Sequence, residues 1–389
     1  MVGAGQLARM THQAAIAIGQ SLRVLAGSPD ESAAQVAPWV DIGSHTDLAA
    51  LRAFASHCDV VTFDHEHVPG AHLRALVADG VTVHPGPDAL IHAQDKLVMR
   101  DRLAAMGVPV PAYTAVTEPD DVTRFGDEHG WPCVVKAARG GYDGRGVWQP
   151  ATADEARSLV AELLAAGTPL LVEQRIAMRR ELAALVARSP YGQGAAWPVV
   201  ETVQSDGICV EVLAPAPGLA GRVADDAQEL ALRIAGELGV VGVLAVELFE
   251  TDTGLVVNEL AMRPHNSGHW TIDGAVTSQF EQHLRAVLDY PLGATDPLAP
   301  VVVMANVLGA AEEPAMGVDE RLHHLFARFG EVKVHLYGKA ERPGRKLGHV
   351  TVAGSDLGPV RRVAALAAHW LATAVWADGF DIHGRGDDS

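Results

Sequence analysis

The chain has 389 residues and a mass of 41.0 kDa, which at roughly 150 residues per domain predicts two or three domains. Its composition, with 48% hydrophobic and 20% charged residues, is that of a globular protein and excludes a disordered chain. The formal net charge of −18 argues against nucleic acid or an anionic membrane as a partner, so an anionic ligand would need local cations or a metal ion.

The sequence contains no predicted membrane span. The longest uncharged apolar stretch, residues 301–311, is too short to cross a bilayer and contains Asn306. The first residues, MVGAGQLARM, lack the basic and apolar regions of a signal peptide. The three cysteines, at positions 58, 133 and 209, are too far apart for a zinc motif or a disulfide framework. We therefore expect a cytoplasmic protein.

The N-terminal part of the chain alternates helix and strand patterns. A glycine turn at residues 3–5 opens a helical pattern over residues 6–18, and short strand patterns follow at 22–26, 59–63 and 80–84. This alternation predicts a parallel α/β sheet. A strand should precede the glycine turn, and only two residues stand there. We expect the first strand to be shortened and the natural start to lie upstream.

The remainder of the chain predicts further mixed elements. A helical pattern over 95–106 ends at Gly107, and the proline-rich residues 108–113 form a predicted linker. The elements predicted beyond it are strands at 133–137, 147–149 and 170–174, helices at 154–166 and 226–238, a strand at 241–250, a helix at 278–289, strands at 301–307, 331–337 and 347–352, and a helix that begins at residue 359.

Two apolar strands near residue 250 carry opposed glutamates. A three-residue turn at 252–254, with glycine at its left-handed position, would pair Thr251 with Leu255 and place Glu247 opposite Glu259. Carboxylates about 5 Å apart repel by about 3 kcal/mol at an effective dielectric constant near 20. A divalent cation would remove this repulsion, and Mg²⁺ prefers carboxylate and phosphate oxygens. The alternative is a different register that leaves one glutamate in solvent.

Two other stretches fit phosphate groups. Four glycines fall within residues 139–146, between two predicted strands, and Lys136 and Arg145 lie close by, so backbone N–H groups there could approach a phosphate. Residues 339–346 hold two lysines and two arginines, a cluster that suits a phosphate monoester. A flexible turn and a solvated hairpin tip are the respective alternatives.

Residues 263–270, RPHNSGHW, follow the second glutamate strand directly. They place a cation, two imidazoles and an amide beside the predicted phosphates. The glycine turn at residues 3–8 matches GxGxxG/A, which by itself supports a competing interpretation as a nicotinamide-dependent dehydrogenase.

Taken together, these stretches resemble the ATP-grasp superfamily and, within it, the 5-(carboxyamino)imidazole ribonucleotide synthases, the ATPase subunits of phosphoribosylaminoimidazole carboxylase. The motifs that carry the resemblance are GAGQLARM, KAARGGYDGRG, VEQRI, VELFE with VNELAMRPHNSGHW, and YGKAERPGRKLGH. The resemblance implies an α/β (α+β) ATP-grasp fold. Its domains would be a Rossmann-like pre-ATP-grasp domain at 1–95, an ATP-grasp domain at 96–295 with a lid at about 110–175, and a small C-terminal domain at 296–389.

The resemblance also implies a reaction. ATP and bicarbonate would give carboxyphosphate, which carboxylates 5-aminoimidazole ribonucleotide in purine biosynthesis, with Mg²⁺ as the metal and Mn²⁺ as an alternative. The fragile carboxyphosphate would need a lid that excludes water. The resemblance further suggests a homodimer.

The resemblance assigns roles to particular residues. The nucleotide would be held by Lys96, Lys136, Gly141, Tyr142, Asp143, Gly144, Arg145, Gly146, Glu173, Gln174, Arg175, Ile176, Glu181, Gln204, Asn258 and Glu259. The metal ligands would be Glu247 and Glu259. The residues at the reacting centre would be Tyr142, Asp143, Arg145, Arg263, His265 and Asn266. The ribonucleotide would be bound by Gln6, Glu66, Ser267, Lys339, Arg345 and Lys346.

One departure and three alternatives remain open at this point. Lys96 stands where the family more often has Arg, and Arg100 stands where Lys is usual, so the exact phosphate contact of this pair is undecided. The alternatives are another ATP-grasp purine ligase of the formate-dependent glycinamide ribonucleotide transformylase type, an NAD-dependent dehydrogenase, and a nucleotide-binding protein without turnover.

Overall fold

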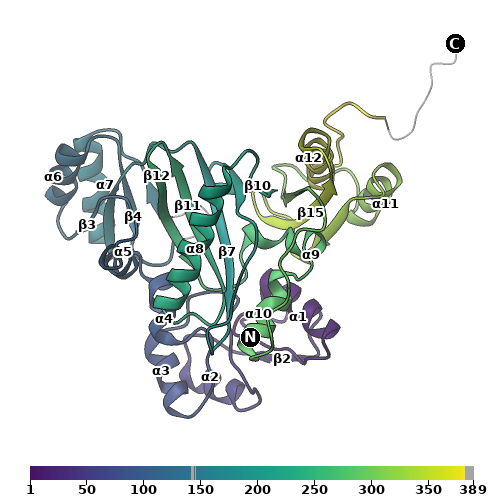
Figure 1. The fold of residues 1–389 in the computed structure, drawn as a ribbon, viewed down its shortest axis with the longest axis horizontal. Helices are drawn as coiled ribbons and strands as arrows, with labels where there is room; N and C mark the ends of the chain where they lie inside the picture. Colours follow the sequence, from purple (N-terminus) through teal and green to yellow (C-terminus); the bar gives the residue numbers. More distant parts are fainter. Residues whose placement is uncertain (142–143, 145, 382–389) are drawn as a thin grey trace.

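The structure is a computed structural model, and it describes residues 1–141, 144 and 146–381. The predicted loop residues Tyr142, Asp143 and Arg145 therefore lie outside the described residues. The described strands form three sheets, of which the largest is central, with α6 and α7 on one side, α11 and α12 on the other, and α2 to α4 below (Figure 1). No described helix has the length and apolar character needed to cross a membrane.

The N-terminal part is the predicted parallel α/β arrangement. Its elements are α1 (Gln6–Ala17), β1 (Arg23–Ala26), β2 (Trp39–Ile42), α2 (Leu48–Ala55), α3 (Gly70–Ala78) and α4 (Pro87–Gln94). Strands β1 and β2 pair in parallel, and single parallel bridges join Val2 to Leu25 and Phe63, and Val61 to Val83. The predicted strands at 59–63 and 80–84 are thus reduced to bridges. Val2 occupies the position of the strand before the glycine turn.

A small antiparallel sheet follows α5 (Lys96–Ala105). Its strand order is β3 (Tyr113–Val116), β6 (Leu170–Gln174), β4 (Cys133–Ala137) and β5 (Val147–Trp148), with α6 (Pro119–His129) and α7 (Ala153–Ala165) packed together beside it. Asp95 caps α5 by accepting the N–H groups of Leu97 and Val98, and Gly107 ends it with a φ of 68°. The helix predicted at 95–106 is therefore confirmed.

The large sheet is antiparallel and contains nine strands. Its order is β12 (Gly254–Ala261), β11 (Gly242–Thr251), β7 (Arg180–Arg188), β9 (Val200–Ser205), β10 (Ile208–Ala214), β13 (Val301–Leu308), β15 (Lys346–Gly354) and β14 (Lys333–Leu336), and β8 (Gly194–Ala196) also pairs with β7. The helices associated with it are α8 (Gly221–Glu237), η1 (Asn266–Gly268), α9 (Thr271–Gly274), α10 (Gln279–Val287), α11 (Val318–Arg328) and α12 (Leu357–Thr373). The sheet is continuous from β11 to β15. It therefore contains strands from both sides of residue 296, the predicted start of the C-terminal domain.

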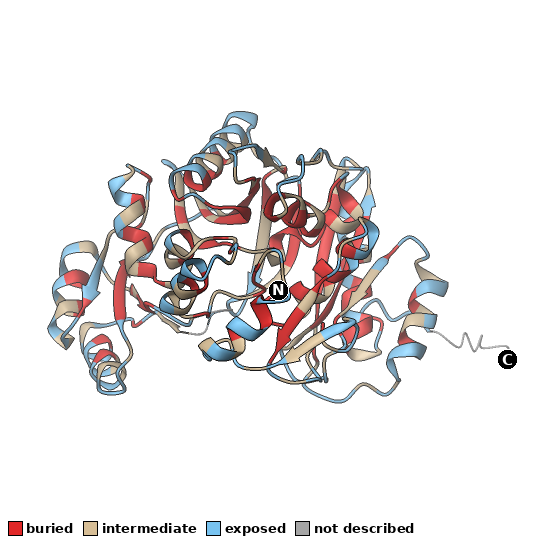
Figure 2. Ribbon diagram, turned by 90° about the horizontal axis from the view of Figure 1, so that it is seen from below, coloured by how far each residue is buried: buried red, intermediate tan, exposed pale blue. Residues whose placement is uncertain are grey.

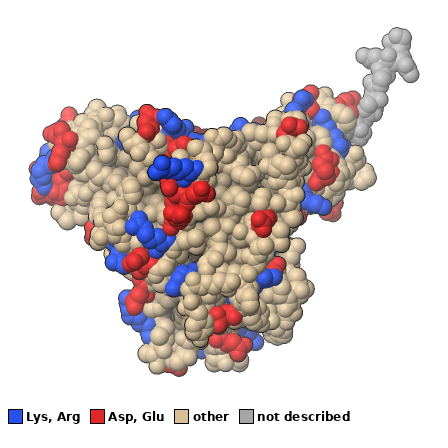
Figure 3. Space-filling model, viewed as in Figure 1, with Lys and Arg blue, Asp and Glu red and all other residues tan. Residues whose placement is uncertain are grey.

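Burial follows the strands. Buried residues lie along the central strands and on the inner faces of the helices, while exposed residues lie at the periphery (Figure 2). On the face of the molecule seen in Figure 3, acidic and basic side chains are interspersed instead of forming a patch of one sign. The net charge of −18 is therefore not concentrated into an acidic surface on this face.

His283 on α10 links the N-terminal part to the large sheet. Its Nδ1 accepts the N–H of Val243 at 3.2 Å, so its Nε2 carries the proton and donates to Thr62 Oγ1 at 2.7 Å. Burial lowers the pKa of His283 to about 3, so the ring stays neutral. Gly242 permits this packing, because it has a φ of 112° and a Cβ there would lie 2.8 Å from His283 Cε1.

Gly242→Ala should therefore lower the free energy of unfolding by roughly 1–3 kcal/mol, through both backbone strain and the clash with His283. Gly236→Ala, at an exposed site in α8 with open space at the Cβ position, should raise it by about 0.5–1 kcal/mol. Urea unfolding of both variants measures the effect. A Gly242→Ala variant as stable as the wild type would show that the His283 link tolerates displacement.

Candidate active site

The opposed glutamates lie where the sequence predicts them, although the turn differs. The predicted pairing of Thr251 with Leu255 is wrong, because the turn contains two residues instead of three and Thr251 pairs with Gly254. A β-bulge directly after Glu247 compensates for the one-residue difference, so that Glu247 pairs with Glu259. Their side chains are 33% and 38% exposed, which leaves both carboxylates accessible to a ligand.

Three side chains contact this pair of carboxylates. His265 Nε2 lies 3.3 Å from Glu247 Oε1, and Asn258 Nδ2 donates to Glu247 Oε2 at 3.3 Å. Lys96 Nζ forms an ion pair with Glu259. Burial opposes ionisation of Glu247, but the hydrogen bond and charge of His265, with help from Lys96, outweigh it and lower the pKa of that carboxyl.

The donor set fits a magnesium ion that shares its coordination with a ligand. Two carboxylates on neighbouring strands supply hard oxygen ligands, and Mg²⁺ completes its shell with water and phosphate oxygens. Within residues 1–141, 144 and 146–381, no cluster of three or more His, Cys, Asp or Glu side chains could hold a metal ion by itself.

A buried network of ion pairs and hydrogen bonds holds the bulge at Asn258 and the side chain of Lys136 in place. Arg100 is 0% exposed, and its Nε lies 2.6 Å from Glu173 Oε1. The bulge leaves Asn258 without a partner in the β11–β12 pairing, and its carbonyl oxygen accepts a hydrogen bond from Arg100 Nη2 at 2.6 Å. Lys136 Nζ contacts Glu173 Oε2 at 2.7 Å and Asn258 Oδ1 at 3.2 Å. Of the swapped pair, Arg100 is thus a structural cation, and Lys96 is the one that faces the carboxylates.

One cavity, of about 820 Å³, brings together most of the predicted nucleotide residues. Its lining includes Lys96, Lys136, Gly144, Glu173, Gln174, Arg175, Ile176, Glu181, Gln204, Asn258 and Glu259. The carboxylate of Glu173 is already paired with Arg100 and Lys136, so its side chain positions cations and is not free to contact a base. Gly141 lines the neighbouring cavity, and Gly146 accepts a hydrogen bond from the N–H of Ala137.

Glu181 is a predicted nucleotide residue whose carboxyl group has a shifted pKa in this cavity. Burial, together with the charge of Glu247, raises its pKa to about 6, against a hydrogen bond from Gln204 that lowers it. Hydroxyl groups of a ligand that donate to this carboxylate would stabilise its ionised form and offset the effect of burial.

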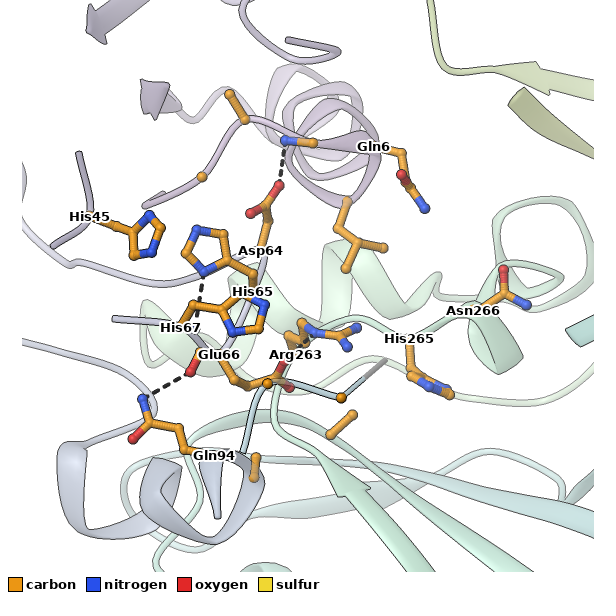
Figure 4. A pocket seen from close by; sticks show the side chains of 18 of the residues that line it. Gln6, His45, Asp64, His65, Glu66, His67, Gln94, Arg263, His265 and Asn266 are labelled. Carbon is orange, nitrogen blue, oxygen red and sulfur yellow. Dashed lines mark hydrogen bonds and ion pairs between the residues drawn. The ribbon is translucent and has the colours of Figure 1, made fainter. Parts of the chain in front are cut away.

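The second cavity, of about 900 Å³, lies between the N-terminal part and the large sheet. Figure 4 shows Gln6, Glu66, Arg263, His265 and Asn266 directed into it. Glu66 accepts two hydrogen bonds that fix the position of the chain at residues 262–263. One comes from Arg263 Nε at 2.7 Å and the other from the N–H of Met262 at 3.1 Å.

The basic residues of segment 339–346 differ in their position relative to the two cavities. Lys346 lines both cavities, whereas Lys339 donates to Gln6 and Arg345 Nη1 donates to the carbonyl of Ala340 at 3.1 Å. Neither of these last two lines either cavity in the described part of the chain. Ser267, by contrast, lines the 820 Å³ cavity, and its Oγ contacts His265 Nδ1 at 2.9 Å.

The two cavities meet at the opposed glutamates. Six residues line both cavities: Lys96, Glu247, Glu259, His265, Asn266 and Lys346. Ligands bound in the two cavities would therefore both lie next to these carboxylates.

Several lining residues were not predicted. His45, His65 and His67 form a cluster of imidazoles in the wall of the 900 Å³ cavity, with ring centroids 4.7 Å apart for the first two and 5.2 Å apart for the last two. Burial lowers the pKa of His65 to about 3. Asp64 accepts the N–H of Gly5 in the same wall. The sequence did carry a signal for this wall of the cavity, because residues 64–67, DHEH, are polar and directly follow a predicted strand.

Comparisons with known proteins place this geometry in context. Family models match residues 1–94 as a ribonucleotide synthetase preATP-grasp domain, 101–280 as an ATP-grasp domain, and 302–362 as a phosphoribosylaminoimidazole carboxylase C-terminal domain. The N5-carboxyaminoimidazole ribonucleotide synthase of Mycobacterium bovis is 67% identical over 390 residues, covering 100% of this chain and 91% of that protein. The synthase of Corynebacterium ammoniagenes is 50% identical, covering 98% and 93%.

Solved structures agree with the sequence relatives. The N5-carboxyaminoimidazole ribonucleotide synthetase of Thermus thermophilus superposes with a TM-score of 0.84 at 37% identity, covering 96% of this chain and 99% of that one. The N5-carboxyaminoimidazole synthase of Aspergillus clavatus, solved with ADP and 5-aminoimidazole ribonucleotide, gives 0.85 at 30% identity, covering 95% and 98%.

Asp64 gives a test of the electrostatics of the 900 Å³ cavity. Burial raises its pKa from 3.8 to about 6, so between these values the folded chain binds more protons than the unfolded chain. The free energy of unfolding contributed by this group therefore falls as the pH rises from about 4 to 6, by at most about 3 kcal/mol. Asp64→Asn should remove that fall and be the more stable form above pH 6.

Urea unfolding at pH 4 to 7 measures this difference. Asp252→Asn, whose side chain is 81% exposed at the hairpin turn, should keep the wild-type pH dependence. Parallel curves for the wild type and Asp64→Asn would contradict the assignment.

Proposed function

The chain belongs to the N5-carboxyaminoimidazole ribonucleotide synthase family, and on that premise we propose how its residues divide the family's reaction. It is an ATP-grasp carbon–nitrogen ligase of purine biosynthesis, which uses ATP to carboxylate 5-aminoimidazole ribonucleotide. Because the chain belongs to this family, the dehydrogenase, transformylase and non-catalytic interpretations are no longer needed. The observation that carries the proposal is the pair of cavities that meet at Glu247 and Glu259.

We propose that ATP lies in the 820 Å³ cavity and the ribonucleotide in the 900 Å³ cavity. Gln174 to Ile176 and Glu181 line the end of the first cavity that would take the nucleoside, and Lys96 and Lys136 would meet the phosphates. The approximate domain boundaries 1–95, 96–295 and 296–389 remain part of this proposal, as does a homodimer. The loop residues Tyr142, Asp143 and Arg145 stay predicted contributors to the closing loop.

Bicarbonate is the proposed source of the carboxyl group. Its oxygen forms a bond to the γ-phosphorus as the bond to the ADP oxygen breaks, which gives carboxyphosphate. The amine nitrogen of the ribonucleotide then bonds to the carboxyl carbon, phosphate leaves, and the nitrogen loses a proton. Making the mixed anhydride first replaces one difficult step by two easier ones.

The protein's contribution to these steps is placement and charge. Mg²⁺ bound by Glu247 and Glu259 would neutralise charge on the phosphoryl oxygens. Lys96, paired with Glu259, and Lys136, paired with Glu173, are buried cations held in place before a ligand binds, so they would need little reorganisation when the phosphoryl group moves. Arg263, His265 and Asn266 line the acceptor side, where they can orient bicarbonate and the amine.

The ribonucleotide would be held by groups from three parts of the chain. Gln6 and Glu66 come from the N-terminal part and Lys346 from β15, while Ser267, from the loop after β12, lines the 820 Å³ cavity and would act through its contact with His265. Lys339 supports Gln6 through its hydrogen bond, and Arg345 lies next to Lys346 in sequence. We therefore expect Lys346 to make the main contact with the 5′-phosphate of the ribonucleotide.

Glu259→Ala should reduce ADP release by at least about 10³-fold while the protein remains folded, because a metal ligand worth several kcal/mol of transition-state stabilisation is lost. Asp252→Asn, in the same hairpin, should retain activity. Turnover is followed by ADP release with ribonucleotide and bicarbonate, and Mn²⁺ binding in the presence of ATP is followed by water proton relaxation. Wild-type turnover by Glu259→Ala would refute the metal assignment.

Lys346→Ala should raise the KM for 5-aminoimidazole ribonucleotide by about 10- to 100-fold, the loss expected for one charge-assisted hydrogen bond to phosphate. The KM for ATP should change by less than about 3-fold. Lys333→Ala, an exposed lysine on β14 that lines neither cavity in the described chain, is the matched control. Equal effects of Lys346→Ala on both substrates would place the lysine on the nucleotide instead.

A further inference from the structure

Helix α10 carries two buried glutamines that hold backbone in the same way. Gln279 and Gln282 are both fully buried. Gln279 Oε1 accepts the N–H of His265, and its Nε2 donates to the carbonyl of His265, both at 2.8 Å. Gln282 holds the N–H and carbonyl of Gly293 by the same two bonds, also at 2.8 Å. Each amide therefore clamps both peptide groups of one residue in a loop.

Gln279 makes one bond that Gln282 does not. Its Nε2 lies 3.0 Å from His269 Nδ1. The N–H of His265 must be met by the amide oxygen, so the amide nitrogen is the group that faces His269 and can only donate. His269 Nδ1 is therefore an acceptor and the ring proton is on Nε2. Burial lowers the pKa of His269 far below its usual range, so the ring is neutral and the tautomer is fixed.

The loop held in this way forms the junction of the two cavities. His265 lies 3.3 Å from Glu247, and both polar atoms of the Asn266 side chain are buried without a hydrogen-bond partner in the described structure. Both residues line both cavities. The loop also packs tightly on the amide, since a Cβ at Gly268 would lie 2.4 Å from Gln279 Oε1. A shift of Gln279 would therefore move His265 and Asn266 together.

We propose that Gln279 is a positioning residue of this reaction, which holds the 265–269 loop at the junction and sets the tautomer of His269. The inference rests on the proposed function, because the junction matters only if phosphoryl and carboxyl transfer occur there. Gln279 itself lines neither cavity in the described chain, so it acts through His265 and Asn266. A displacement of about 1 Å at such a site can cost about 10²-fold in rate.

The matched pair Gln279→Met and Gln282→Met provides the test. Both substitutions keep a similar volume and remove a backbone clamp from the same helix, so both should lower the melting temperature by similar amounts. Gln279→Met should lower kcat by about 10- to 100-fold and change the KM for ATP by less than about 3-fold, since the nucleoside end of that cavity is built from β6 and β7. Gln282→Met should keep the wild-type kcat. Equal kcat values for the two variants would overturn the proposal.

A second variant reports independently of activity and of folding losses. Gln279→Glu is isosteric and keeps an acceptor for the N–H of His265, but its carboxylate cannot donate to His269. The His269 proton should move to Nδ1, which ¹⁵N shifts of the histidine ring detect in the folded protein. An unchanged Nε2–H tautomer would overturn the assigned role. If the wild type itself released no ADP with ribonucleotide and bicarbonate, the proposed function would fail while the tautomer result would still stand.

Discussion

The arrangement depends on keeping two like charges opposite one another at the edge of a sheet. Glu247 and Glu259 pair across β11 and β12, where their repulsion would favour a slipped register or protonation. Lys96, Asn258 and His265 oppose both outcomes by direct contacts to the carboxylates. The energetic cost of this pair is the reason that the surrounding cations are buried, since a charge that compensates another has to stay within a few ångströms of it.

The surrounding fold brings distant parts of the chain to that pair. The N-terminal sheet supplies the glycine turn and Glu66, α5 supplies Lys96, the small sheet supplies Lys136, and β15 supplies Lys346. Lys96 and Lys346 are the first residues of their elements and Lys136 lies next to the last residue of β4, so these side chains can project into a cavity while the backbone stays paired. The bulge at Asn258 serves the same purpose, because it turns one amide toward Glu247 and leaves a carbonyl for Arg100.

Sequence patterns predicted many of the elements and the opposed glutamates, but they missed others and did not show how the glutamates are held. The hairpin register was right at Glu247 only because a bulge offsets a shorter turn, and bulges leave no clear trace in apolar alternation. Strand β7, RELAALVAR, was not predicted because its residues favour helix locally, and its position between β11 and β9 overrides that preference. The burial of Arg100 and the clamp by Gln279 depend on contacts between distant residues, which one sequence does not display.

The uninterrupted large sheet has a mechanical consequence. Glu247 on β11 and Lys346 on β15 belong to one ladder of hydrogen-bonded strands, β11-β7-β9-β10-β13-β15. Their spacing is thus set by stiff backbone and does not depend on the approach of separate bodies. Lys136, by contrast, sits on the four-stranded sheet, which in the described part of the chain shares no strand pairing with the large one. A movement of the smaller sheet can therefore shift Lys136 without changing the spacing of Glu247 and Lys346.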